Sequence, residues 1–232
     1  MYIDMTYIVL VLPAVILSLW ASWNVKHTFE KYSRVMNARG LTGAQAARRV
    51  LDANGLRDVP VARVSGELSD HYDPEGRIVN LSDSVYGSSS VAAIGVACHE
   101  VGHAIQNAEG YMPIRIRQAI IPATNIGAKL SVPLLFAGLL LASFSPKLLY
   151  LAYAGVALYS LCALFQLVTL PVEFDASSRA LRSIEGMGLM AGEEYQSAKK
   201  VLKAAALTYV AALATTLAQL LRFIMLVNNR RR

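Results

Sequence analysis

The alternation of apolar and polar stretches divides the chain into four long hydrophobic runs separated by polar sequence. The runs cover about residues 2–23, 120–144, 148–170 and 201–227. Each is near or above the length of about 20 residues that an α-helix needs to cross a bilayer. Two polar stretches, at about 24–117 and 171–200, lie between them. The pattern predicts a mainly α membrane protein with about four transmembrane helices and a small α+β domain.

This reading assigns the chain to five segments. No Lys or Arg precedes the first run and no small-residue cleavage site follows it, so we expect a retained anchor there rather than a cleaved signal peptide. The segments are a transmembrane helix at 1–23, a polar domain at 24–118, a transmembrane helical hairpin at 119–170, a polar helix at 171–200, and a fourth transmembrane helix with a basic tail at 201–232.

Local sequence patterns in the polar domain predict individual helices, strands and turns. "LTGAQAARRVLDANGL" predicts a helix with Thr42 as its N-cap and Gly55 as its stop. "VARVSGELSD" and "GRIVNLSDSVYG" predict two short strands, with "HYDPEG" as the turn between them. Serines 88–90 supply an N-cap for a following helix, which we expect to end at Gly110 and Pro113.

A hairpin of two membrane helices leaves and re-enters the same side of the bilayer. The polar domain before the hairpin and the polar helix after it must therefore lie on one face of the membrane. Side chains from these two segments, which are far apart in sequence, can then contribute to one site.

Composition and charge support a multi-pass protein of the cell membrane. Hydrophobic residues make up 55% of the chain, the mean hydropathy is +0.41, and the net charge is +6. No basic stripe interleaved with aromatics is present, which argues against nucleic acid as a partner. Most basic residues flank the apolar runs on the side of the polar domain, which predicts that this domain faces the cytoplasm. Lys147 and the three terminal arginines are the exceptions.

The stretch "ACHEVGHAIQNAEG" carries the candidate chemistry. His99 and His103 are four residues apart, so both imidazoles lie on one face of a helix, as two zinc ligands require. Glu100 can reach a metal-activated water without binding the metal, which is the HExxH pattern of metalloproteases. An ordinary surface helix is the alternative, but the apolar neighbours predict burial, and burying these groups without a metal would be costly.

Two histidines leave a catalytic zinc site incomplete, and "LPVEFDASSRALRS" after the hairpin offers the third ligand. On a helix Glu173 shares a face with Ser177 and Ala180, whereas Asp175 faces Arg179 and Arg182. Asp175 therefore has an explanation as an ion pair, and Glu173 is the preferred ligand. The alternative for Glu173 is a carboxylate favoured by the helix dipole. Cys98 is expected to be a packed thiol.

"CHEVGHAIQ" followed beyond an apolar hairpin by "LPVEFDAS" resembles the bacterial membrane-embedded neutral zinc metallopeptidases of the YugP type. The resemblance covers essentially the whole chain. The layout is also similar to the Ste24/HtpX membrane proteases, in which a Glu-x-x-x-Asp pattern supplies a zinc ligand and a residue that orients a histidine. Here Ser177 stands in the Asp position, which leaves the orienting role to Asp175 or a backbone carbonyl. The resemblance implies a gluzincin-like peptidase with a zincin-like domain at 24–118.

The favoured function is an integral-membrane zinc metallopeptidase, with endopeptidase activity expected, that uses Glu100 as general base on peptide or membrane-protein substrates. We expect the strand "GRIVNLS" to form the edge of the cleft, where a substrate could pair with it. His71, Tyr72 and Arg179 are candidates for stabilising the oxyanion, although His71 fits a turn better. The alternatives are a membrane scaffold or chaperone with a structural zinc, and a small transporter, for which the intramembrane polar residues are too few.

Overall fold

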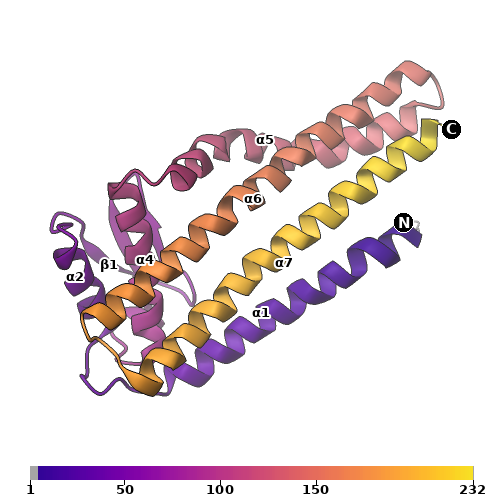
Figure 1. Cartoon of the computed structure of the whole chain (residues 1–232). Coiled ribbons are helices and arrows are strands. Elements are labelled where there is room, and N and C mark those ends of the chain that lie inside the picture. The colour runs from indigo at the N-terminus through magenta and orange to yellow at the C-terminus, as the bar shows by residue number, and fades with distance from the viewer. Residues whose placement is uncertain (1–4, 232) are drawn as a thin grey trace. The chain divides into compact units, whose positions relative to one another are not determined.

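The computed structural model describes residues 5–231 and is mostly helical (Figure 1). It confirms the predicted class, a mainly α membrane-type protein with a small α+β part. The elements in chain order are η1 (Tyr7–Val11), α1 (Leu12–Ser33), α2 (Gly43–Ala53), β1 (Val61–Val64), β2 (His71–Asp73), β3 (Ile78–Ser82), α3 (Asp83–Tyr86), α4 (Val91–Ala108), α5 (Met112–Leu141), η2 (Pro146–Leu148), α6 (Leu149–Gly186) and α7 (Gly192–Arg231).

Among the described residues, four helical stretches are long and apolar enough to cross a membrane, and they carry the predicted runs, apart from residues 2–4 of the first run, which lie outside the described residues. They are Tyr7–Ser33, Met112–Leu141, Pro146–Gly186 and Gly192–Arg230. Each helix continues past its apolar run into polar sequence. All four predicted internal boundaries, at 23, 118, 170 and 200, therefore fall inside continuous helices. Hydropathy can change along a helix without interrupting its backbone hydrogen bonds, so it does not mark where a helix ends.

The chain forms two compact units, and the long helices run from one into the other. The first unit holds the residues up to Trp20, Ile116–Leu170, and those from Tyr209 onward. Within it α5 and α6 form the predicted hairpin. A Cβ on Gly127 or Gly155 would lie only 2.7 or 2.6 Å from backbone atoms of the facing helix. Small residues at these positions therefore allow close helix packing, as is common in membrane helices.

The second unit, Ala21–Arg115 and Pro171–Thr208, contains the sheet. Its strand order is β1-β3-β2, with β1 parallel and β2 antiparallel to β3. The sequence interpretation was wrong here in two ways. "HYD" is strand β2 rather than part of a turn, and "GRIVNLS" contains the central strand rather than an edge. Four of the five residues of β3 are buried, as expected for a strand paired on both sides.

Helix α4 is buried along most of its length and lies within the core of the second unit. Val50 and Leu51 of α2, Leu81 of β3 and Ile184 of α6 belong to the same hydrophobic cluster as α4's own Ile94. The predicted caps are confirmed, since the side chain of Thr42 accepts a hydrogen bond from the N–H of Gln45, and that of Ser90 accepts one from Ala93. Gly110 follows α4 with φ of +65°, a value that favours glycine. Pro113 lies inside α5 and does not end α4.

Candidate metal centre

Helix α4 presents two imidazoles to the same point in the second unit. His99 and His103 lie one turn apart, and their ring centroids are 4.8 Å from each other in an edge-to-face arrangement. His103 is 8% exposed, and the side chain of His99 is 12% exposed. The four-residue spacing on a helix accounts for this placement. Two ring nitrogens thus point into a largely desolvated space.

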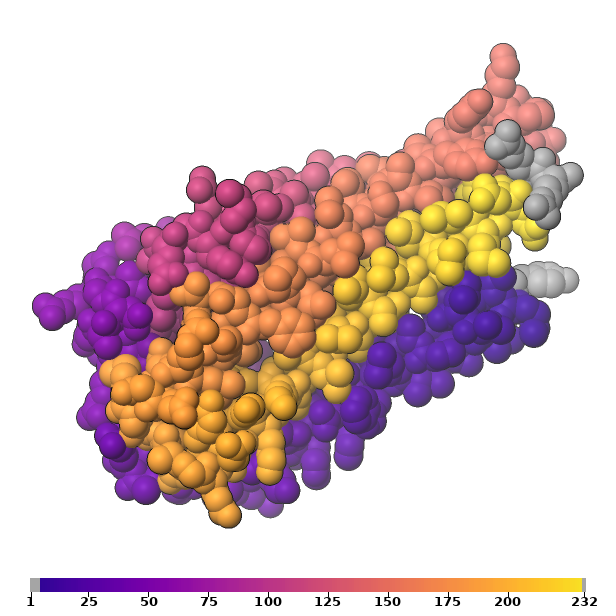
Figure 2. All heavy atoms as spheres, in the orientation of Figure 1, coloured from indigo at the N-terminus to yellow at the C-terminus, as the bar shows by residue number. Residues whose placement is uncertain are grey.

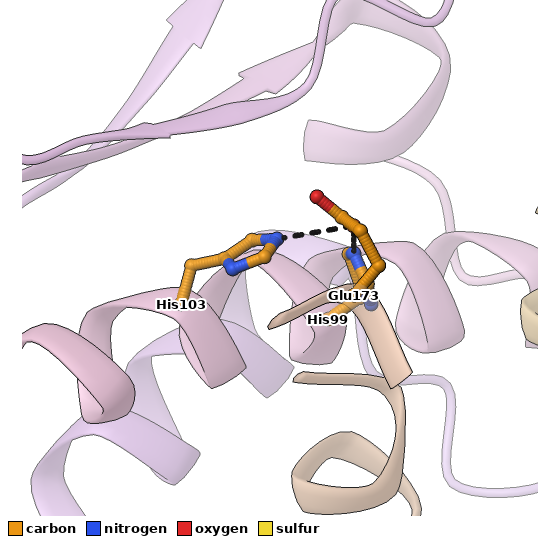
Figure 3. Close-up of side chains that lie close together, drawn as sticks. All are labelled: His99, His103 and Glu173. Atoms are coloured by element: carbon orange, nitrogen blue, oxygen red, sulfur yellow. Dashed lines mark hydrogen bonds and ion pairs between the residues drawn. The ribbon is translucent and has the colours of Figure 1, made fainter. Parts of the chain in front are cut away.

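Glu173 of α6 enters this space and meets both histidines (Figure 3). Its Oε2 lies 3.3 Å from Nε2 of His99 and 3.5 Å from Nε2 of His103. Glu173 is only 2% exposed. One donor atom from each of the three residues lies within 4.8 Å of the other two. A carboxylate and two imidazoles that lie 70 and 74 residues away in the sequence therefore converge.

The donor set fits zinc. Zinc in proteins is bound by histidine nitrogens and carboxylate oxygens at about 2.1 Å, and tetrahedral geometry places two such ligand atoms about 3.4 Å apart. The two carboxylate–imidazole separations, 3.3 and 3.5 Å, are close to that value, and all three donor atoms lie within 4.8 Å of one another. Two histidines and one glutamate are also a known catalytic ligand set, which leaves a coordination position open.

The other nitrogen of each imidazole is held by a polar side chain. Nδ1 of His99 lies 3.1 Å from Oγ of Ser177, and Nδ1 of His103 lies 3.0 Å from Oε1 of Gln106. A partner at Nδ1 directs Nε2 toward the shared space and fixes the ring orientation. Ser177 is therefore in contact with the histidine at the position where the resembling group has Asp. The orienting contact to His103 comes from Gln106, a residue not considered from the sequence.

Glu100 lies next to His99 in the chain and is 8% exposed. Its Oε2 accepts a hydrogen bond of 3.0 Å from the backbone N–H of Tyr72 in β2. The carboxylate is therefore tied to an edge strand of the sheet rather than to the three converging donor atoms. Glu100 also acts electrostatically on His103, so the two groups are close.

Burial and neighbouring charges shift the pKa values of His103 and Cys98 in α4. Burial lowers the pKa of His103, but the hydrogen bond that its ring donates to Glu173 and the negative charges of Glu100 and Glu173 outweigh this effect, so the pKa lies above its ordinary value. Cys98 is fully buried, and burial raises its pKa to about 12. The thiol therefore stays protonated and packed, as expected from the sequence.

The family of the chain follows from direct comparison. A family model described as "Putative neutral zinc metallopeptidase" matches residues 7–228. The chain belongs to this family. It is 49% identical over 227 residues to "Putative membrane protease YugP" of Bacillus subtilis (strain 168), covering 98% of this chain and 99% of that protein. No solved structure matches the chain.

In this neutral zinc metallopeptidase family member, Asp175 lies outside the converging donors. Its Oδ2 accepts hydrogen bonds from Nε of Arg179 at 2.6 Å and from Nε2 of Gln106 at 2.9 Å. The predicted ion pair with Arg179 is confirmed, and Arg179 also pairs with Glu109 at 2.6 Å. Asp175 thus reaches His103 indirectly, through the amide of Gln106.

Helices α4 and α6 of this metallopeptidase family member approach closely beside the metal centre. A Cβ on Gly102 would lie 2.6 Å from the carbonyl oxygen of Ala176, inside van der Waals contact. Gly102 lies between His99 and His103 in α4, and Ala176 lies three residues beyond Glu173 in α6. The missing side chain of Gly102 therefore sets how near the carboxylate can come to the imidazoles.

Sequence reasoning missed Gln106 and Gly102 because it sought the residue that orients a histidine only around Ser177 and Asp175, and because it did not consider the spacing between helices. A usable signal was present for Gln106, which follows His103 by three residues and so lies on the same helix face. Of the three oxyanion candidates, His71 is bound to Ser69 and Asn80, and Arg179 is held by two carboxylates. The hydroxyl of Tyr72 accepts a hydrogen bond from Asn107, which leaves its own proton available.

Proposed function

We propose that this chain is an integral-membrane zinc metallopeptidase, in which His99, His103 and Glu173 hold the metal and Glu100 is the general base. The observation that carries the proposal is the convergence of three donor atoms from α4 and α6 within 4.8 Å. Membership of a zinc metallopeptidase family supports the choice of metal and reaction. When bound, zinc supplies Lewis acidity and lowers the pKa of water at its open position.

The residues of the chain then supply the proton transfers. Glu100 accepts a proton from the attacking water and later delivers it to the leaving amine. The N–H of Tyr72 holds one carboxylate oxygen and so limits the directions in which Glu100 can point. Ser177 and Gln106 keep the two Nε2 atoms directed at the metal. In this scheme Glu100 moves protons, while Glu173 remains a ligand.

Strand β2 is the part of the sheet best placed to receive a peptide. It pairs with β3 on one side only, and the N–H of Tyr72 contacts Glu100 of α4. An extended peptide can bind an exposed strand edge through backbone hydrogen bonds, which brings a peptide bond alongside the general base. The Tyr72 hydroxyl is the donor we assign to the developing oxyanion, because the other two candidates are already engaged.

The membrane location and substrate class follow from the same helices. Four helices are long and apolar enough to span a bilayer, and the Bacillus subtilis relative is named as a membrane protease. We therefore place the active site at a membrane surface, acting on peptides or membrane proteins as an endopeptidase. The excess of basic residues flanking the apolar runs on the side of this domain supports a cytoplasmic orientation.

The decisive experiment compares metal content and cleavage in three purified proteins. Wild type should hold one zinc and cleave a quenched-fluorescence peptide library. Glu100→Gln should keep the zinc and lose roughly 10²–10⁴-fold in kcat. Glu75→Gln, which changes an exposed carboxylate, should match wild type in both. Full zinc with no cleavage in any of the proteins would instead favour a structural zinc site in a membrane scaffold or chaperone.

A further inference from the structure

A basic groove lies between α1 and α7 in the second unit. We define it by its lining residues, which come from these two helices only. It has a volume of about 380 Å³ and is lined by Asn24, His27, Thr28, Lys31, Tyr32, Lys200, Lys203, Ala204 and Leu207. Both sets follow the spacing i, i+3, i+4, i+7, so each helix contributes one continuous face.

The two helices run antiparallel. In the first unit Oγ of Ser18 lies 2.9 Å from the hydroxyl of Thr215, and Thr215 also donates to the carbonyl of Ala14. α1 and α7 lie side by side in the space-filling view, α1 in indigo and α7 in yellow to orange (Figure 2). Because the order of residues is opposite in the two helices, Lys31 and Lys200 lie toward one end of the groove and Leu207 toward the other.

The charged end of the groove is uniformly positive. Lys31, Lys200 and Lys203 are exposed, and no carboxylate lines the groove. Within the described residues 5–231, no ion pair joins any of these three lysines to an acidic side chain. Three neighbouring ammonium groups repel one another, so an anion bound among them would relieve that repulsion.

The other end of the groove carries no lysine and is lined by Ala204 and Leu207 of α7 together with the uncharged polar residues Asn24 and Thr28 of α1. Ala204 and Leu207 belong to the apolar run of α7. On α1, the ring of Trp23 stacks on His27 with centroids 5.1 Å apart, and Trp23 is 59% exposed. Tryptophan is enriched at membrane–water interfaces. The groove thus changes along its length from cationic to uncharged, in the order in which a lipid changes from its phosphate to its acyl chain.

We propose that this groove binds an anionic phospholipid, with the phosphate among Lys31, Lys200 and Lys203 and an acyl chain along Ala204 and Leu207. The proposal rests on the membrane location proposed above, but not on zinc or peptide cleavage. A soluble phosphate would satisfy the lysines and leave Ala204 and Leu207 without a ligand. A bound lipid would hold α1 against α7 at the point where both leave the apolar sequence.

The experiment titrates phosphatidylglycerol and phosphatidylcholine against full-length Glu100→Gln protein in neutral detergent, with native mass spectrometry as the readout. The protein with an unchanged groove should bind phosphatidylglycerol in preference to phosphatidylcholine. Lys31→Gln should weaken phosphatidylglycerol binding about fivefold, and the triple change of Lys31, Lys200 and Lys203 to Gln about 100-fold. Lys26→Gln is the matched control, because it removes the same charge from the exposed opposite face of α1.

Several outcomes would overturn the proposal. Equal loss with Lys26→Gln and Lys31→Gln would indicate general charge attraction rather than a groove. The groove would not recognise an anionic phospholipid if inorganic phosphate at equal concentration displaced phosphatidylglycerol. The same would follow if phosphatidylcholine bound as tightly as phosphatidylglycerol. An unchanged unfolding midpoint in detergent shows that each variant is folded. Resistance of the protein to alkaline extraction from membranes separates failure of this site from failure of the proposed membrane location.

Discussion

Gln106 Oε1 lies 3.0 Å from Nδ1 of His103, and its amide nitrogen donates both to the carbonyl of Val172 and to Asp175. These two acceptors determine which end of the amide faces the imidazole, because an amide nitrogen can only donate. In the neutral imidazole of His103, Nδ1 therefore carries the proton and Nε2 carries the lone pair. One fully buried side chain thus links the two ligand-bearing helices and sets the tautomer that a metal requires.

Replacing Gln106 should weaken zinc binding without removing a ligand. We expect Gln106→Met to lower zinc affinity roughly 10- to 100-fold, the usual effect of losing an orienting partner. Competition with a chromophoric chelator measures the affinity. Gln196→Met, which changes an exposed glutamine of α7, is the matched control and should leave the affinity unchanged.

Gln106→Glu separates orientation from packing. A carboxylate still accepts from Nδ1 of His103, but it cannot donate to Val172 or Asp175. We expect zinc affinity to be largely retained and the free energy of unfolding to fall, because the buried carbonyl of Val172 loses its side-chain donor and two carboxylates meet. Unchanged zinc affinity in Gln106→Met would show that Gln106 only fills space.

Gly102 supports a second prediction, about the spacing of α4 and α6. A methyl group there would lie 2.6 Å from the carbonyl of Ala176, so Gly102→Ala should push α6 away and separate Glu173 from the histidines. We expect lower zinc occupancy and a destabilisation of about 1–3 kcal/mol, as for overpacked cores. Zinc content and the unfolding midpoint in detergent test both effects.

The control for Gly102 lies in the same helix. A Cβ on Gly95 would lie 3.5 Å from the Cβ of Ala198, an ordinary contact. Gly95→Ala should therefore keep full zinc and gain up to about 1 kcal/mol of stability from the higher helix propensity of Ala over Gly. If both variants lose zinc equally, the close contact between Gly102 and Ala176 has no special role in positioning Glu173.

The long helices of this fold were predictable from the sequence, whereas the short strands were harder to predict. Four apolar runs predict four helices because a helix in a membrane must bury about 20 residues. The i, i+4 spacing of His99 and His103 likewise predicts one shared face. By contrast, "HYDPEG" predicts a turn where the structure has the three-residue strand β2, because the segment has turn residues and too few positions to show alternation.

The limits of sequence reasoning at the metal centre have a similar cause. The periodicity of α6 favoured Glu173 over Asp175, since Glu173 and Ser177 lie on one face. The contact between Gly102 and Ala176 depends on how two helices cross, and no spacing within either helix encodes that. The roles of Gln106 and Asp175 depend on the same crossing. Local patterns therefore identified groups within each helix, whereas the contacts between helices needed coordinates.

Tyr72 supports a third prediction, about the transition state. Its backbone N–H holds Glu100 and its hydroxyl accepts a hydrogen bond from Asn107. Tyr72→Phe removes only the hydroxyl, so the contact to Glu100 and the zinc site should remain. We expect kcat to fall roughly 10²–10³-fold with little change in KM, as when an oxyanion donor is lost. An unchanged kcat would contradict this role, and His71→Gln is the control in the same strand.

The raised pKa of His103 leads to a prediction about zinc and pH. In the zinc-free protein, proton binding to His103 contributes stability below the ordinary pKa of histidine, and this contribution is lost as pH rises through the raised pKa. Zinc must displace that proton from His103, so the affinity of the site for zinc rises with pH. We therefore expect zinc to stabilise the protein more at pH 8 than at pH 6.

The measurement is the unfolding midpoint with and without a chelator at both pH values. At pH 8, free zinc at 100 times its dissociation constant should add about 2.7 kcal/mol to the free energy of unfolding. At pH 6 the increase in the free energy of unfolding should be smaller, because part of the free energy of zinc binding is used to remove the proton from His103. His71→Gln should preserve this difference, since His71 lies outside the cluster. An equal gain at both pH values would mean that zinc binds without displacing a proton from His103.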